Sequence, residues 1–168
     1  QVIQRFSKDS GNVVISGFVE KAHPTSFEIK ITGTGLQGNW EQIQTTVTGS
    51  FFEGKKVLPA GGWYRLEVRA WRGKTILAES HVDHVGIGEV FVVAGQSNSA
   101  NHGEERQMTV TGLVSSFNGD GWQLANDPQP GADGDGGSFL PPFGDAMAEK
   151  LRVPIGFVAC GVGGTSVR

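Results

Sequence analysis

Ser97 is the residue of this sequence whose surroundings best suit chemistry. It lies in Gly95-Gln96-Ser97-Asn98, directly after the apolar run 90–94. Such a run fits a short strand buried on both faces of a parallel sheet. Open α/β sheets bind ligands at the carboxyl ends of their strands, so a serine in this turn is a candidate nucleophile. The same residues also suit a plain polar turn in which Ser97 or Asn98 caps a helix.

A second block has the same organisation. Residues 153–160 are mostly apolar and run into Gly161-Val162-Gly163-Gly164-Thr165-Ser166. If the two strands are parallel neighbours, Ser97 and the diglycine turn come to one edge of the sheet. Backbone N–H groups there can hold the negative charge that develops in acyl transfer, and glycine lets substrate approach the backbone closely.

Together the two blocks, with Gly88-Glu89-Val90 leading into the first, resemble those of the SGNH (GDSL-like) hydrolases. The resemblance is to the branch of sialate O-acetylesterases and acetylxylan esterases. It implies a carbohydrate O-acetyl esterase, a serine hydrolase with Ser97 as nucleophile. The amides of Ser97 and Gly163, with Gly164 as the alternative, would form the oxyanion hole. An acetylated sugar as substrate, no cofactor and a secreted or periplasmic location are the corresponding expectations.

The base of such an enzyme is the part of the family pattern that this sequence does not match. The family supplies it from an Asp-x-x-His pair, and none of the four histidines, His23, His81, His84 and His102, stands three residues after an aspartate. An unassisted serine hydroxyl is a poor nucleophile near neutral pH. We therefore expect an amino-terminal part of a larger esterase, whose carboxyl-terminal part would be its partner. His102 is expected to be a solvated side chain.

Candidate substrate contacts are Gln96, Asn98 and Trp122. Trp122 lies in the glycine- and aspartate-rich segment 118–138, which the resemblance makes one wall of the substrate cleft. A calcium site formed by Asp127, Asp133 and Asp135 is one interpretation of this segment. These residues lack the EF-hand pattern, and a solvated loop is the favoured interpretation. We expect no metal site.

The elements that must position Ser97 follow from the hydrophobic pattern. Period-two segments at 12–20, 26–32, 40–48 and 63–71 predict strands separated by turn residues. Residues 1–85 are accordingly predicted to form an all-β, immunoglobulin- or fibronectin-III-like sandwich, an accessory domain. Residues 86–168 are predicted to be the first part of an SGNH-type α/β domain, flavodoxin-like with a parallel sheet. A helix is expected at 143–151, and another can begin within 99–106.

Composition excludes some function classes. Of 168 residues, 38% are hydrophobic, which is typical of a globular protein, and the net charge is −3. Residues 1–85 carry ten Lys/Arg and eight Asp/Glu, whereas 86–168 carry four and nine. Neither half has a basic cluster, so nucleic acid is not an expected partner. No apolar run reaches the roughly 18–20 residues of a membrane span, so a membrane is not an expected partner either.

Three other features have bland interpretations that we prefer. Trp40, Trp63 and Trp71 suit packing in or beside strands better than sugar stacking. In His81-Val82-Asp83-His84 only the first and third residues share a strand face, so three metal ligands do not converge. The single cysteine, Cys160, is expected to be a buried small hydrophobe.

Two other functions remain open. One is a non-catalytic carbohydrate-binding or adhesion module in which the β-sandwich carries the function and the Ser97 block is a relic. The other is a lipid or phospholipid hydrolase of the wider SGNH group. The Gly-Gln-Ser-Asn start of the block, in place of Gly-Asp-Ser-Leu, disfavours this last function.

Overall fold

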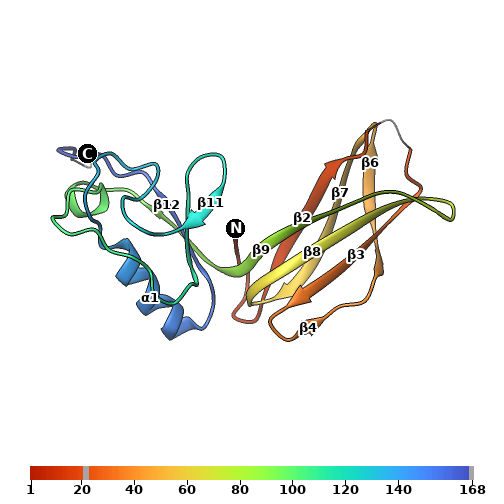
Figure 1. Cartoon of the computed structure of the whole chain (residues 1–168), viewed down its shortest axis with the longest axis horizontal. Coiled ribbons are helices and arrows are strands. Elements are labelled where there is room, and N and C mark those ends of the chain that lie inside the picture. The colour runs from red at the N-terminus through yellow and green to blue at the C-terminus, as the bar shows by residue number, and fades with distance from the viewer. Residues whose placement is uncertain (21–22, 167–168) are drawn as a thin grey trace. The chain divides into compact units, whose positions relative to one another are not determined.

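The computed structural model describes residues 1–20 and 23–166 (Figure 1). In chain order the elements are β1 (Val2–Gln4), β2 (Ser10–Phe18), β3 (Ser26–Gly33), β4 (Leu36–Gln37), β5 (Glu41–Ile43), β6 (Thr45–Thr48), β7 (Phe51–Pro59), β8 (Gly61–Arg72), β9 (Thr75–Val93), the 3₁₀ turn η1 (Ser97–Ser99), β10 (Val114–Phe117), β11 (Trp122–Leu124), α1 (Leu140–Leu151) and β12 (Ile155–Ala159).

The chain divides into two compact units. Arg5–Val85 form one, which we call the strand unit. Gln1–Gln4, together with the chain from Gly86 onward, form the other, which we call the serine unit. Strand β9 runs through the boundary and so contributes to both. The sequence pattern put the first four residues with the strand unit, because a three-residue strand carries no signal of where its partner lies.

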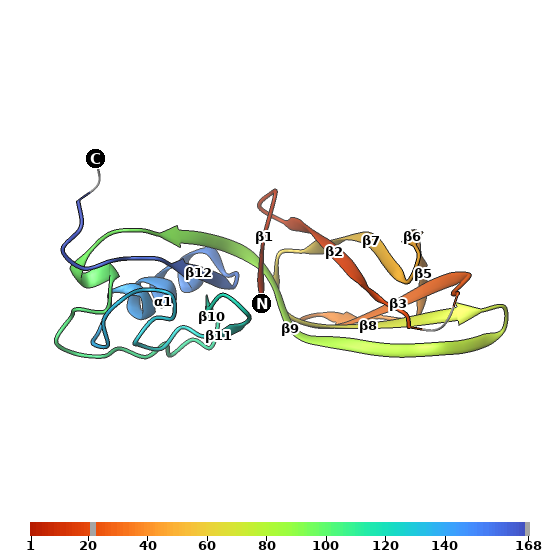
Figure 2. The same cartoon turned by 90° about the horizontal axis from the view of Figure 1, so that it is seen from above.

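The strand unit has strands in two sheets. In one, β9, β8, β3 and β4 are neighbours in that order and β5 also pairs with β3; the other has the order β2-β7-β6. Figure 2 shows them as two layers. The inward residues Phe27, Ile29 and Ile31 of β3 are buried. Phe27 stacks on Phe52 of β7 with ring centroids 4.2 Å apart, so the core lies between the layers.

The serine unit is built on a mixed sheet. Its strand order is β11-β10-β12-β9; β10, β12 and β9 are parallel, while β11 is antiparallel to β10. Strand β1 adds to β9 in parallel. Helix α1 contacts β12 and β10. A Cβ on Gly144 of α1 would lie 2.4 Å from Val114 Cγ1, so the absence of a side chain there allows close packing on the sheet.

The predicted fold class, a β-sandwich followed by a flavodoxin-like α/β domain, is wrong. The chain is mostly β, with 51% of residues in strands and 9% in helices. Among the described residues α1 is the only α-helix, and the mixed sheet gives no flavodoxin-like arrangement. A doubly wound sheet needs helices on both faces, which one helix cannot supply.

The helix expected within 99–106 fails for a local reason. Asn101, inside this segment, has a left-handed backbone with φ of 56°, which a right-handed helix does not accommodate. The chain then forms a β-bridge from Gly103 to Gly137. Downstream, β11 occupies part of the predicted loop 118–138, and α1 begins at Leu140 with Pro141 and Pro142 in its first turn.

Candidate functional site

Ser97 lies on the turn that leaves the carboxyl end of β9. The side chain is exposed, and its Oγ donates a hydrogen bond of 2.8 Å to Gln96 Oε1. The turn closes on Ser97 O, which accepts the N–H groups of Ala100 and His102. A left-handed serine is an uncommon, strained conformation, and strained residues cluster at functional sites.

The diglycine turn lies at the same edge of the sheet. Cys160 N donates to Val93 O at 2.9 Å, and Val162 N donates to Gly95 O at 3.0 Å, so the contact between β12 and β9 continues past both strand ends. This brings the turn that holds Gly163 and Gly164 to the turn that holds Ser97. Cys160 is exposed here, which corrects the expectation that it is buried. It lies just past the end of β12, which ends at Ala159.

His102 and Asp133 form a pair beside these two turns. His102 Nε2 and Asp133 Oδ1 are 3.2 Å apart, with about half of each side chain exposed. The ring lies against Gly163, since a Cβ there would be 2.5 Å from His102 Nε2. On another side it meets Gly134, whose Cβ would be 3.1 Å from Cε1. The expectation of a solvated His102 therefore missed a built contact.

Asp133 also holds the diglycine turn itself. Gly163 N donates to Asp133 Oδ1 at 2.8 Å, and Asp133 N donates to Gly161 O at 3.0 Å. Of the expected oxyanion donors, Gly163 N–H is thus already bonded to a carboxylate. Within residues 1–20 and 23–166, the N–H groups of Ser97 and Gly164 have no hydrogen-bond partner.

A buried polar network fixes the segment that carries Asp133. Asn101, 1% exposed, exchanges two hydrogen bonds with the backbone of Gln129: its Nδ2 donates to Gln129 O and its Oδ1 accepts Gln129 N–H. The Gln129 side chain donates to Asp127 Oδ1, and the Asp127 carboxylate also accepts the N–H and Oγ–H of Ser138. Asp127 is therefore used inside the protein. No three described His, Cys, Asp or Glu side chains gather as metal ligands.

The three predicted substrate contacts do not all lie beside Ser97. Gln96 and Asn98 are exposed on the serine turn itself. Trp122 is placed elsewhere: its ring covers Gly156 in β12, where a Cβ would be 2.8 Å away, and lies 5.6 Å from the Phe117 ring. Its backbone pairs with Phe117, the last residue of β10, but its ring lies over β12. The sequence carried no signal for this, because Trp122 lies in a strand that the glycine-rich pattern concealed.

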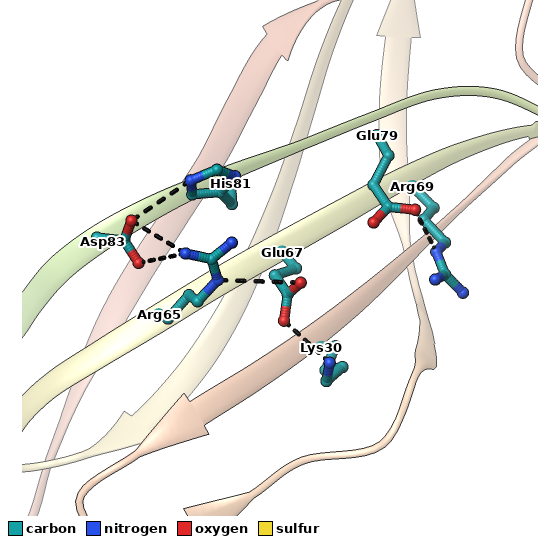
Figure 3. Close-up of polar contacts among 7 residues, drawn as sticks. All are labelled: Lys30, Arg65, Glu67, Arg69, Glu79, His81 and Asp83. Carbon is teal, nitrogen blue, oxygen red and sulfur yellow. Dashed lines mark hydrogen bonds and ion pairs between the residues drawn. The ribbon is translucent and has the colours of Figure 1, made fainter.

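The tryptophans of the strand unit all contact protein groups. Arg69 covers the Trp40 ring at 3.7 Å from the centroid, Trp71 Nε1 donates to Glu28, and Trp63 lies 5.1 Å from the His84 ring. Arg69 belongs to a surface of ion pairs on β3, β8 and β9 (Figure 3). In this surface Arg65 bonds Asp83 at 2.8 Å, and the hydrogen bond from Lys30 lowers the pKa of Glu67.

None of the described helices has the length and apolar character to cross a membrane. Comparison of the sequence with protein-family models and with curated proteins finds no match in either case.

Proposed function

We propose that this chain supplies the nucleophile and the oxyanion donors of a carbohydrate O-acetyl esterase, acting in a secreted or periplasmic setting. The observation that carries the proposal is the edge at which the exposed, left-handed Ser97 meets the diglycine turn. The resemblance of both blocks to SGNH hydrolases supports it. The one-helix serine unit is a departure from the fold of those enzymes, so the proposal depends on the site and not on the fold.

The chemistry is acyl transfer in two steps. Ser97 Oγ loses its proton and attacks the acetyl carbonyl carbon, and the bond from that carbon to the sugar oxygen breaks as the sugar oxygen takes up a proton. The acetyl group is then held as an ester on Ser97. Water attacks the ester, releasing acetate and restoring the hydroxyl. Each N–H that holds the oxyanion contributes on the order of 3 kcal/mol of transition-state stabilisation.

The proton of Ser97 has no basic acceptor among the described residues. Its Oγ donates to the amide oxygen of Gln96, which is not a base. We expect the 168-residue chain to hydrolyse p-nitrophenyl acetate no faster than its Ser97→Ala variant. A rate that depends on Ser97 would place a base within the chain, with His102 the first residue to substitute.

Imidazole added in solution supplies the base that this measurement lacks. The test is acetylation of the chain by p-nitrophenyl acetate with imidazole present, read at each serine by peptide mass spectrometry. We expect an acetyl group on Ser97, and none at that position in Ser97→Ala. Ser80, an exposed serine of β9 in the strand unit, is the control within the same molecule. Acetylation of Ser97 no faster than that of Ser80 would contradict the proposal.

Acetylated xylan and acetylated sialic acid, offered in place of the nitrophenyl ester, then test the substrate class. Transfer from either sugar to Ser97 supports a carbohydrate esterase. A non-catalytic sugar-binding module would instead bind these glycans through the strand unit with Ser97 unmodified. The contacts of Trp40, Trp63 and Trp71 with protein groups count against that alternative, because their rings are engaged by neighbouring side chains.

A further inference from the structure

One carboxylate oxygen occupies the place where the proposed enzyme would bind its oxyanion. Asp133 Oδ1 accepts the Gly163 N–H at 2.8 Å. The same oxygen lies 3.2 Å from His102 Nε2. A hydrogen bond to a carboxylate is roughly twice as strong as one to a neutral oxygen. An acyl oxygen or a free carboxylate must therefore displace Asp133 before it can use this amide.

The position of Asp133 makes such an exchange possible. Its side chain is 46% exposed, so the carboxylate can move into water without breaking the core. Its backbone is held separately, through Asp133 N to Gly161 O, and this bond does not depend on where the carboxylate lies. The amides of Ser97 and Gly164, unpartnered within the described residues, are the other two expected oxyanion donors.

We propose that Asp133 is an internal anion that regulates the oxyanion site. While its carboxylate holds Gly163 N–H, small carboxylates such as acetate, the product of the proposed reaction, are excluded from that amide. When the side chain leaves, the Gly163 amide joins those of Ser97 and Gly164. The inference rests on the proposed function for the meaning of the site, but the competition itself is a property of binding and needs no turnover.

The test is acetate titration of the ¹⁵N-labelled chain, followed by the Gly163 and Gly164 amide resonances. Asp133→Asn keeps the side-chain shape and removes the charge. We expect acetate to bind this variant roughly fivefold or more tightly than the parent, because a neutral amide holds the N–H less strongly. Asp133→Ala, which has no acceptor, should bind acetate at least as tightly as Asp133→Asn.

Asp135→Asn is the matched control. It removes the same charge from the same segment, and the hydrogen bond from Arg106 Nε is retained because it is made to the backbone oxygen of Asp135. An equal gain in Asp135→Asn would show general charge repulsion and overturn the proposal. Equal affinity in parent and Asp133→Asn would overturn it too. So would collapse of the 161–164 amide signals in both Asp133 variants, since Asp133 would then be purely structural.

The outcomes for regulation and for catalysis are separable. If Asp133 competes with acetate but Ser97 is not acetylated, the regulated anion site is supported and the esterase proposal is rejected. If Ser97 is acetylated but Asp133 has no effect on acetate binding, the esterase proposal is supported and the regulation by Asp133 is rejected.

Discussion

Two left-handed residues, Ser97 and Asn101, delimit the serine turn, and each has a different role. Ser97 exposes its hydroxyl. Asn101 is 1% exposed, and its side chain exchanges two hydrogen bonds with the backbone of Gln129, as a neighbouring strand would. Asparagine tolerates the left-handed backbone better than most residues, and its amide offers both a donor and an acceptor. The end of the turn is thereby tied to the segment that carries Asp133.

Asn101→Ala should destabilise the serine unit. It leaves the buried N–H and C=O of Gln129 without partners, at a cost of about 1–3 kcal/mol for each group, so a loss of at least ~2 kcal/mol in the free energy of unfolding is expected. Urea denaturation measures it. Asn98→Ala, at an exposed asparagine of the same turn, should change stability by less than about 0.5 kcal/mol. Equal effects of the two variants would show that the network carries no stability.

At the residue scale, the sequence predicted site features that lie within one short segment and missed contacts between residues far apart in the chain. Ser97 and the diglycine turn each lie at the end of an apolar run, and the structure brings the two turns together. The pair of His102 and Asp133 is separated by 31 residues and has no local pattern. The contact depends on two glycines, Gly134 and Gly163, that leave room for the ring. Glycine in a sequence does not reveal what approaches it.

At the scale of elements, Asp145 joins helix α1 to the chain before β10. Its carboxylate accepts hydrogen bonds from the hydroxyls of Thr109 and Thr111 and from the N–H groups of Val110 and Thr111. Burial raises the pKa of Asp145, but these four bonds to the charged form outweigh it, and the net pKa lies below the ordinary 3.8. All four donors lie outside the helix, so the contact ties α1 to the segment before β10.

This lowered pKa gives a pH dependence with a definite sign. The stability that Asp145 contributes is present above the pKa of the unfolded chain and is lost as pH falls through the lower folded pKa. Asp145→Asn should lower the free energy of unfolding by about 1.5–3 kcal/mol at neutral pH. The difference from the parent should shrink in strong acid. Urea denaturation across pH measures this, with Glu149→Gln, at an exposed position of the same helix, as control. A difference that stays constant with pH would contradict the assignment.

Periodicity predicted individual strands better than their assembly. The segments at 26–32 and 63–71 lie within β3 and β8, because alternation reports directly on one buried face. The arrangement after Gly86 could not be predicted, since two apolar runs and one helix are compatible with many sheets. Asn101, whose left-handed backbone excludes a helix after Ser97, is an ordinary asparagine in the sequence.

At the scale of the whole molecule, the serine unit is discontinuous in sequence. Its first strand, β1, comes from the start of the chain and pairs with residues 86–88 of β9. Val2 is 4% exposed, and Gln4 bonds both Glu89 and the N–H of Val90. The composition change near residue 85 indicated a boundary but not this return, because nothing in three residues encodes a distant partner.

Removal of residues 1–4 should therefore loosen the serine unit. It should not loosen the strand unit, although that unit directly follows residues 1–4 in sequence. The amides of residues 86–90 lose the strand that covers them and their hydrogen-bond partners. Their hydrogen exchange should therefore accelerate by tenfold or more, which corresponds to about 1.4 kcal/mol of local stability. Exchange of β3 amides serves as the internal control and should not change. Accelerated exchange confined to the strand unit would contradict the division of the chain.

The return of β1 also has a consequence for the order of events on the ribosome. Val2–Gln4 leave the exit tunnel before the strand unit, yet their hydrogen-bonding partners at 86–88 are translated more than eighty residues later. The intervening strand unit has its own core and can complete it in that interval, as domains generally fold during synthesis. Strand β1 is thus made before the strand unit but pairs only after that unit, when residues 86–88 have been translated.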